Sequence, residues 1–501
     1  MSRTDRAELA DTSRLSRVAW CPVGLAMAAL AVVLSLTSNR YGYHRDELYF
    51  RMLHPAWGYV DQPPLAPLLA RAFSAGLADS PWAMRIPATS AAVVSVLVLA
   101  LVTRELGGGR RAQAMCAWGY AFASIPLIMG HALLTSTLDL PVWPAFVLFV
   151  IRAQLRGQPR WWLAAGAVAG LSTSNKLLIA VLVVAVAAGI LVSGPRALLR
   201  SRWPAAGALL ALVLSVPNIV YQAGHGWPQL SIGRALAREN ASSVHVMLIP
   251  FLFLILGPPL APVWLSGWIA LLRRDGWRPV RLLGAAFPVL LVLVFAMGAQ
   301  FYYPFGLLAV LFAAGCVPLD RWMGTSAAAR RLAVGGVALN SAVSVVLGLP
   351  VIPVSRLGAT PIPSINQVER DTVGWPAYVR EIEAVYDTVP RAEQRTAIVL
   401  TSNYGEAGAV ARYGRPGLRG KVYSGHNQLF YDRKPPASAA VVVFVGGQVL
   451  RKRGLFETCR IAGSLDDQVG VDNEEQGKPI AVCRMAPGGW TAGWPALRHE
   501  G

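Results

Sequence analysis

The chain has 501 residues, of which 54% are hydrophobic and only 15% are charged. Because soluble domains carry about 25% charged residues, this composition excludes an ordinary soluble protein. The net charge of +19 comes mostly from arginine. No basic segment is interleaved with aromatic residues, which argues against a nucleic-acid partner.

Nearly uncharged runs recur along the chain as far as residue 350. Several approach the ~20 apolar residues that a helix needs to cross a bilayer. We therefore predict a polytopic α-helical membrane protein with about 11 transmembrane helices. The expected spans are residues 18–37, 82–103, 113–132, 138–151, 161–175, 177–194, 203–220, 245–271, 281–297, 304–320 and 332–350.

Arginine clusters follow every second span, as the positive-inside rule predicts for cytoplasmic loops. The clusters are Arg104, Arg110 and Arg111; Arg152, Arg156 and Arg160; Arg196, Arg200 and Arg202; Arg273, Arg274, Arg278 and Arg281; and Arg321, Arg330 and Arg331. Before the first span lie Arg3, Arg6, Arg14 and Arg17. This alternation predicts a multi-pass plasma-membrane protein with a cytoplasmic N-terminus, and it places the loop 38–81 and all residues after 350 outside.

The composition changes after residue 350, where charges and turn residues increase and apolar runs shorten. The stretch "WPAYVREIEAVYDTV" predicts an amphipathic helix, and "TAIVLT" and "AAVVVFVG" predict buried strands. We therefore expect a transmembrane domain over residues 1–350, with 38–81 as its first external loop, and an extracytoplasmic α/β domain over 351–501. In that oxidising environment, Cys459 and Cys483 could form a disulfide.

Two adjacent acids follow the first span, in "YGYHRDELYF". In one interpretation, Asp46 and Glu47 are interface charges that cap a short helix. In the other, a carboxylate just outside the membrane is a general base that takes a proton from an acceptor hydroxyl. His44 and Arg45 would then help to position the substrate.

A further acid lies in the same loop, in "WGYVDQPPLAPLLARAF". The two prolines after Gln62 break any helix there. The apolar stretch that follows can form a helix in the membrane interface, with Trp57 and Tyr59 as anchors. Asp61 is then either the cap of a proline turn or a second acid in the same cavity as Asp46.

Besides Arg45, three cationic residues outside the arginine clusters are candidates for binding a phosphate. Lys176 lies between two apolar runs, where a charge is costly and a functional role is the default hypothesis; a snorkelling lysine is the alternative. Arg234 and Arg238 lie one helical turn apart in "SIGRALAREN", so they share a face. That face could bind a ligand or simply be solvated.

A collinear set of motifs runs through most of the chain. It comprises "DELYF" and "VDQPPL" in the first external loop, then "TSTLDLPVW", "GLSTSNKLL" and "AQFYYPFGLLAVLFAAG", and finally "TSNYGEAGAVARYG", "VYSGHNQLFY" and "VDNEEQGKPIAVC". This set resembles the C-type (GT-C) glycosyltransferases, and more narrowly the protein O-mannosyltransferase superfamily. That superfamily includes the lipid A aminoarabinose transferases and the bacterial glycosyltransferases of families 39 and 83.

The resemblance implies a GT-C fold and an enzyme that takes a sugar from a polyprenyl-phosphate donor and transfers it with inversion on the outer side of the membrane. Acceptors in this superfamily are envelope glycans, lipids or proteins. Asp46 matches the family's catalytic acid, and Asp61 matches the acid before the two prolines. Asp139 lies in the second external loop, and Tyr302 and Tyr303 match the region near the donor phosphate.

The chain also departs from the aminoarabinose transferases. Gln62 stands where they have a lysine, and the stretch after Glu47 lacks their arginine. Neutralisation of the donor phosphate must then come from Arg45, Lys176, Arg234 or Arg238, or from a divalent cation. The carboxylates of Asp46, Asp61 and Asp139 could hold such a cation, and Glu47 is a further candidate for contact with the substrate.

Three classes of function compete. The first is the lipid-linked glycosyltransferase, and the second is a transporter or flippase of lipid-linked sugars. The third is a non-catalytic structural membrane protein with an external interaction domain, which would not need Asp46 and Asp61. Transporters commonly show repeats with broken helices near the midplane. Here the acids collect in one external loop and no half-chain symmetry is visible, which favours the transferase. In the C-terminal part, Asn403, Glu406, His426 and Asn427 are either turn residues or part of a carbohydrate-contact surface.

Overall fold

The computed structural model describes residues 15–486 and 488–500, and the chain divides into two compact units. The helical unit contains the residues up to Thr37, Ile86–His131 and Thr135–Leu349. The mixed unit contains Ser38–Arg85, Ala132–Leu134 and the chain from Pro350 onward. The division falls between Leu349 and Pro350, and the segment Ser38–Arg85 is grouped with the C-terminal part. Arg3, Arg6 and Arg14 lie outside the described residues.

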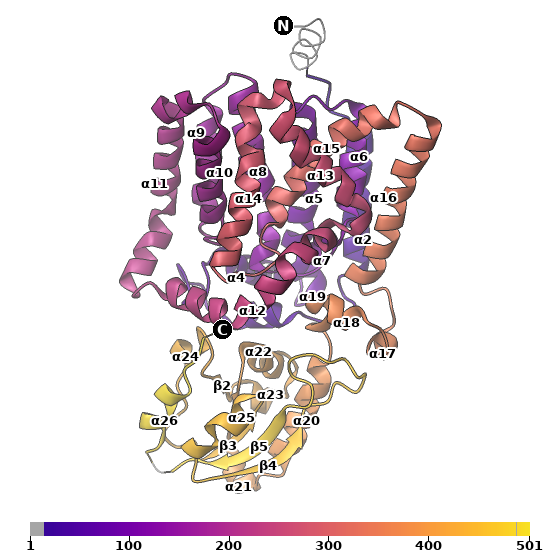
Figure 1. Ribbon diagram of the computed structural model, residues 1–501. Helices are drawn as coiled ribbons and strands as arrows, with labels where there is room; N and C mark the ends of the chain where they lie inside the picture. Colours follow the sequence, from indigo (N-terminus) through magenta and orange to yellow (C-terminus); the bar gives the residue numbers. More distant parts are fainter. Residues whose placement is uncertain (1–14, 487, 501) are drawn as a thin grey trace, which may run out of the picture. The chain divides into compact units, whose positions relative to one another are not determined.

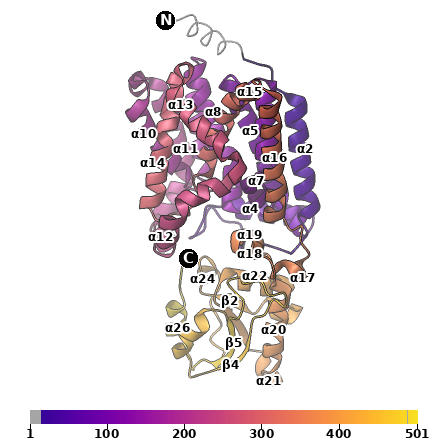
Figure 2. The same cartoon turned by 45° about the vertical axis from the view of Figure 1, so that its right-hand side comes forward.

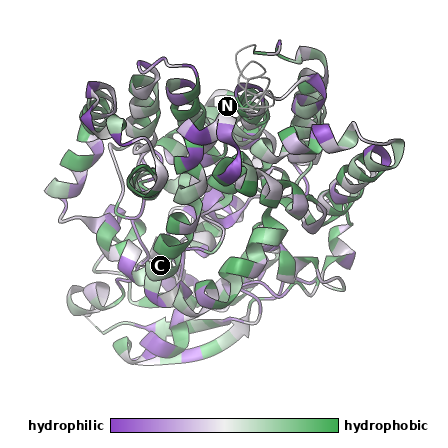
Figure 3. Cartoon of the chain, turned by 45° about the horizontal axis from the view of Figure 1, so that its top comes forward, coloured by the Kyte–Doolittle hydropathy of each residue, from purple (hydrophilic) through white to green (hydrophobic). Residues whose placement is uncertain are grey.

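Most helices of the helical unit run side by side as a bundle in Figure 1 and Figure 2. Apolar residues predominate along these helices (Figure 3). The helices are α2 (Trp20–Thr37), α5 (Pro81–Glu105), α6 (Arg110–Ala121), α7 (Ser124–Gly130), α8 (Thr135–Leu155), α9 (Trp161–Ser172), α10 (Ile179–Ser193), α11 (Arg202–Gly224), α12 (Pro228–Leu256), α13 (Ala261–Arg273), α14 (Arg281–Ala296), α15 (Phe305–Met323) and α16 (Ala327–Gly348); the first residues of α5, Pro81–Arg85, belong to the mixed unit.

Within the described residues, seven helices are long and apolar enough to cross a membrane, or up to nine if each of two bent pairs counts as one span. The chain is thus a multi-pass membrane protein, as predicted, but the count of 11 spans is not confirmed. Two of the expected spans correspond to α9 and α10, which are apolar but shorter. The span expected over 113–132 is bent by 53° between α6 and α7.

The expected span 245–271 is broken where α12 ends and α13 begins. Gly257 has a φ of +97°, which favours glycine, and a Cβ there would lie 1.9 Å from Oδ1 of Asn340. Pro258 and Pro259 follow directly and cannot continue the hydrogen-bonded helix. The apolar run is continuous in sequence, but the Gly-Pro-Pro signal ends the helix.

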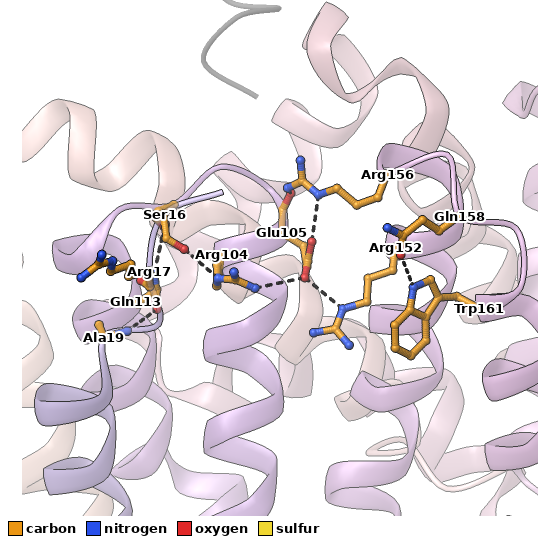
Figure 4. Close-up of polar contacts among 11 residues, drawn as sticks. Ser16, Arg17, Ala19, Arg104, Glu105, Gln113, Arg152, Arg156, Gln158 and Trp161 are labelled. Atoms are coloured by element: carbon orange, nitrogen blue, oxygen red, sulfur yellow. Dashed lines mark hydrogen bonds and ion pairs between the residues drawn. The ribbon is translucent and has the colours of Figure 1, made fainter. Parts of the chain in front are cut away.

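Arginines from two of the expected inner loops meet at one end of the helical unit (Figure 4). The buried carboxylate of Glu105 accepts hydrogen bonds of 2.9 Å from Nε of Arg152 and 2.9 Å from Nε of Arg156, and Arg104 contacts it at 3.5 Å. At the same end, the Gln113 side chain accepts a bond of 2.9 Å from the Ala19 amide. The carboxylate thus joins α5 to α8 and leaves an excess of positive charge.

The mixed unit contains a five-stranded sheet in the order β2-β1-β3-β5-β4. Strands β1 (Ile398–Thr401), β2 (Val422–Ser424) and β3 (Val441–Val445) are parallel, and β5 (Pro479–Arg484) and β4 (Thr458–Ser464) join antiparallel. The two predicted strands are β1 and β3, and every residue in both is buried. The predicted amphipathic helix is α20 (Trp375–Asp387), which contacts β3, β4 and β5.

The mixed unit also contains further helices, two of which lie in the 38–85 segment. They are α3 (Arg45–Met52), α4 (Leu65–Gly76), α17 (Val354–Leu357), α18 (Ile362–Ile365), α19 (Gln367–Arg370), α21 (Arg391–Gln394), α22 (Tyr404–Tyr413), α23 (Pro416–Arg419), α24 (Leu429–Asp432), α25 (Gln448–Lys452) and α26 (Trp490–Ala496). Cys459 on β4 faces Cys483 on β5, and the two are joined by a disulfide.

Candidate active site

The first acid of the predicted pair lies at the start of α3. His44 is the N-cap, and its Nδ1 accepts a hydrogen bond of 3.1 Å from the Asp46 amide. The Glu47 carboxylate in turn accepts a bond of 2.8 Å from the His44 amide, which completes a capping box. The helix start therefore fixes the backbone of Asp46, and its side chain remains partly exposed.

The second acid of the pair is fully buried. Both Glu47 oxygens accept bonds from Arg85, at 2.9 Å from Nε and 2.8 Å from Nη2, and Oε1 also accepts from the Leu133 amide at 2.9 Å. Both side chains of this ion pair are 0% exposed. The substrate contact that we expected for Glu47 does not fit this geometry, because its carboxylate is already engaged in anchoring the start of the loop.

The partner of Asp46 comes from the C-terminal part of the chain. The hydroxyl of Tyr404 donates a hydrogen bond of 2.9 Å to Asp46 Oδ1. Tyr404 is the first residue of α22, directly after the carboxyl end of β1, a common location for functional residues in α/β folds. Gly408 lets α22 approach α3 closely, because a Cβ there would lie 2.7 Å from the backbone carbonyl of Leu48.

Asp61 is held in a parallel manner. The hydroxyl of Tyr49 donates a bond of 3.0 Å to Asp61 Oδ1 and accepts one of 3.2 Å from the Gln428 amide. Burial raises the pKa of the Asp61 carboxyl to about 7; the Tyr49 bond opposes this shift and the nearby Asp46 charge adds to it. The ring centroids of Tyr49 and Tyr404 are 4.6 Å apart. The structure thus links the two predicted acids through a stacked tyrosine pair.

Arg45 is engaged by acidic neighbours. It forms an ion pair with Glu474, and its Cζ lies 4.9 Å from the centre of the Tyr404 ring. Burial raises the pKa of Glu475 to about 7, although Arg45 lowers it. The charge of Arg45 is therefore largely offset within the mixed unit, which weakens its expected role in neutralising a phosphate.

The four residues of the predicted carbohydrate-contact surface, Asn403, Glu406, His426 and Asn427, have structural roles around α22. Asn403 and Glu406 form the capping box of α22, with the Glu406 amide 2.9 Å from Asn403 Oδ1. Burial raises the pKa of Glu406 well above its usual range. His426 accepts a bond of 3.2 Å from the Tyr404 amide, and Asn427 has a φ of +49°. Asn403 and Glu406 therefore act as helix-cap residues, and the left-handed backbone of Asn427 fits the turn interpretation.

Lys176 lies in a second cluster, which belongs entirely to the helical unit. Its Nζ donates a bond of 2.7 Å to Ser136 Oγ and lies 4.5 Å from the centre of the Tyr303 ring. The Tyr302 hydroxyl is 3.5 Å from the same Ser136 oxygen. One ammonium group and two phenols, all three predicted from the sequence, thus converge on the start of α8.

Asp139 lies buried next to the Lys176 cluster, beside Asn175. It is fully buried, and its Oδ1 is 3.4 Å from Asn175 Nδ2, which also donates to the Thr135 carbonyl at 2.8 Å. A direct contact of Asp139 with substrate, as we expected, does not fit its burial. Arg234 and Arg238 are exposed on the first part of α12, and among the described residues no hydrogen bond joins them to Lys176.

The suggested cation site is not supported. Among the residues that the structure describes, no group of three or more His, Cys, Asp or Glu is placed to hold a metal ion.

Sequence reasoning missed three residues of the site. Arg85 lies at the start of an apolar span. A charged residue in such a place is costly unless it is paired, so its position alone indicates an acidic partner. Tyr49 and Tyr404 gave only a weak local signal. Tyr404 and Gln428 follow the neighbouring parallel strands β1 and β2, so assigning both strands would have placed them at one sheet edge.

Comparison with known proteins agrees with the predicted resemblance to the C-type glycosyltransferases, over part of the sequence and in the fold. A profile of the family described as dolichyl-phosphate-mannose-protein mannosyltransferase matches residues 61–221. That segment begins at Asp61 and includes Asp139 and Lys176. These findings support a glycosyltransferase, the enzyme class that the motifs predict.

Solved structures agree on the fold. ArnT from Cupriavidus metallidurans bound to undecaprenyl phosphate superimposes with a TM-score of 0.61 and 16% identity, covering 93% of this chain and 98% of that chain. The apo state of the same ArnT gives a TM-score of 0.61 and 16% identity, with 92% and 97% covered. At this identity the likeness is one of fold. No curated protein matches the chain significantly.

Proposed function

We propose that this chain is an inverting glycosyltransferase that moves a sugar from a polyprenyl-phosphate donor to an acceptor hydroxyl on the outer side of the membrane, with Asp46 as the general base. The observation that carries this proposal is the different environment of two adjacent acids. Glu47 forms a fully buried ion pair with Arg85. Asp46 is partly exposed, and its carboxylate accepts a hydrogen bond from the Tyr404 hydroxyl.

The chemistry needs one proton acceptor. In an inverting transfer, the acceptor hydroxyl gives its proton to the carboxylate as its oxygen forms a bond to the anomeric carbon, and the bond from that carbon to the donor phosphate breaks. Tyr404 holds Oδ1 of Asp46 at 2.9 Å. In this proposal, the other carboxylate oxygen takes the proton. Asp61, whose pKa is raised to about 7 by burial, is assigned to shaping the loop rather than to sharing this role.

The leaving phosphate needs positive charge and hydrogen-bond donors. In the helical unit, we assign this role to Lys176 with Tyr302 and Tyr303. The Lys176 ammonium and the Tyr302 hydroxyl both lie beside Ser136, and the ammonium also lies over the Tyr303 ring. ArnT from Cupriavidus metallidurans, which shares the fold, was solved with undecaprenyl phosphate bound. Undecaprenyl phosphate is therefore the probe of choice for this cluster.

We also propose that the N-terminus is cytoplasmic and the mixed unit extracytoplasmic. Arg104, Arg152 and Arg156 meet Glu105 at the arginine-rich end of the helical unit (Figure 4). The chain leading into α2 is bound at the same end, because the Ala19 amide donates a hydrogen bond to the Gln113 side chain. The positive-inside rule assigns such an end to the cytoplasm.

The test begins in a deletion strain complemented with each variant at matched expression. Mass spectrometry of the envelope gives the mass of the sugar that the wild type adds, and an undecaprenyl-phosphate sugar of that mass then serves as donor in right-side-out vesicles. Asp46→Asn is expected to lower transfer at least 100-fold while the protein stays folded. Normal transfer by this variant would refute the assignment. Movement of intact donor across the bilayer, with no sugar released, would instead favour the flippase.

A further inference from the structure

Four rings stack face on face through the mixed unit. Tyr49 and Tyr404 are 4.6 Å apart at 27°, Tyr404 and His426 are 4.9 Å apart at 18°, and His426 and His499 are 4.6 Å apart at 6°. We call this set the ring column. It begins in the first loop and ends close to the C-terminus, so it joins segments that are remote in sequence.

Backbone contacts fix the middle of the ring column. Tyr404 opens α22, whose capping box sets its backbone, and the Tyr404 amide donates to Nδ1 of His426 at 3.2 Å. His426 therefore contacts Tyr404 twice, because it stacks on one face of the Tyr404 ring and accepts a hydrogen bond from the Tyr404 amide. Such a double constraint leaves few rotamers open and lowers the entropy cost of holding the hydroxyl in place.

The last ring is held equally firmly. The His499 amide donates to the Gly425 carbonyl at 3.1 Å, and the His499 carbonyl accepts from the Asn427 amide at 3.1 Å. Its ring nitrogens contact the carbonyls of Ser402 at 2.7 Å and Leu497 at 2.8 Å. The final residues thus pair with the loop after β2 and close the ring column.

The hydroxyls of the two tyrosines reach the two acids of the first loop. Tyr404 donates to Asp46 at 2.9 Å and Tyr49 donates to Asp61 at 3.0 Å. Burial raises the pKa of the Tyr404 hydroxyl, so this group stays protonated and acts as a donor. A donor fixed in this way selects one orientation of the carboxylate, which a general base requires for efficient proton transfer.

We propose that Tyr404 is a positioning residue for Asp46, and that the ring column, closed by His499, holds Tyr404 in place. The C-terminal segment is then part of the catalytic apparatus rather than only an appended domain. This inference rests on the proposed function, because it takes Asp46 as the base.

The test uses the vesicle assay described above with the full-length protein. Tyr404→Phe keeps the stacked ring and loses only the hydroxyl, so we expect kcat to fall at least tenfold with an unchanged KM for the donor and an unchanged thermal midpoint. His499→Ala should lower kcat severalfold, and His499→Phe, which restores a ring, should recover most of the loss. The double variant Tyr404→Phe/His499→Ala should be no slower than Tyr404→Phe alone, because both act through one hydrogen bond.

Tyr431→Phe is the matched control, since Tyr431 is an exposed tyrosine of the same unit and should transfer at the wild-type rate. A wild-type kcat for Tyr404→Phe, with Asp46→Asn inactive, would overturn the positioning role and leave the proposed function intact. Additive losses in the double variant would overturn the ring column as the means of positioning. An active Asp46→Asn would refute the proposed function itself.

Discussion

The Tyr404 hydroxyl lies 2.9 Å from Asp46 Oδ1, although 358 positions separate the two residues. The neighbour of Asp46 has a different partner, because Glu47 pairs with Arg85 inside the same unit. Two adjacent acids with similar chemistry therefore have separate roles, one accessible and oriented, the other buried and structural. This division is the basis for the predictions that follow.

Removing one partner of the buried ion pair should strongly destabilise the mixed unit. Arg85→Met leaves the Glu47 carboxylate buried without its counter-charge, a change that costs about 3–5 kcal/mol. We expect a clear fall in the thermal midpoint of the purified protein. The double variant Glu47→Gln/Arg85→Met removes both charges and should recover part of the loss.

The same pair provides a comparison with Asp46. Glu47→Gln should lower the thermal midpoint but keep transfer per folded molecule near the wild-type value, whereas Asp46→Asn should lose transfer. An Arg85→Met protein that unfolds at the wild-type temperature would contradict the anchoring role of the pair.

The raised pKa of Asp61 predicts how stability changes with pH. The folded state holds this proton up to about pH 7, whereas the unfolded chain releases it near the ordinary value of about 4. Because the folded state binds the proton more tightly, raising the pH from about 4 to 7 favours unfolding, and above 7 the effect is constant. Asp61→Asn cannot titrate, so its thermal midpoint minus that of the wild type should increase from pH 5 to pH 8.

Taking the difference between the two proteins isolates Asp61, because Glu369 and Glu475, whose pKa values burial also raises to about 7, are present in both. A difference that stays constant across this range would show that Asp61 is ionised throughout.

Local patterns predicted those features that depend on nearby residues. The apolar runs gave the membrane helices, "TAIVLT" and "AAVVVFVG" gave β1 and β3, and the acids of the first loop were visible as charges beside a span. The pairings of Asp46 with Tyr404 and of Glu47 with Arg85 depend on how distant segments fold together. No local periodicity contains that information. The helix break at Gly257 is indicated by the local Gly-Pro-Pro sequence, but hydropathy alone does not reveal it because the apolar run is continuous.

The close approach of α22 to α3 should make Gly408 sensitive to any side chain. In Gly408→Ala, the new Cβ would lie 2.7 Å from the Leu48 carbonyl carbon and oxygen, and backbone atoms cannot move aside without shifting a helix. Overpacking of this kind costs about 1–3 kcal/mol. We expect a lower thermal midpoint together with slower transfer, because the shift lengthens the bond from Tyr404 to Asp46.

Gly417→Ala is the control for this change. A Cβ at Gly417 meets nothing within 4 Å, so stability and transfer should match the wild type. Equal effects of the two substitutions would mean that loss of glycine flexibility, rather than the contact with Leu48, is responsible.

Lys176 should contribute affinity for the phosphate and not for the lipid chain. Its ammonium group is held by Ser136 and lies over the Tyr303 ring, so it presents a fixed charge to an anionic oxygen. A charge-assisted hydrogen bond is worth about 1.5–3 kcal/mol, so Lys176→Met should weaken binding of undecaprenyl phosphate about 10–100-fold. Lys176→Arg, which keeps the charge but changes its geometry, should retain more of the affinity. Binding of undecaprenol, which lacks the phosphate, should be the same for wild type and Lys176→Met. Equal weakening of both ligands would show that Lys176 shapes the cluster instead of binding the phosphate.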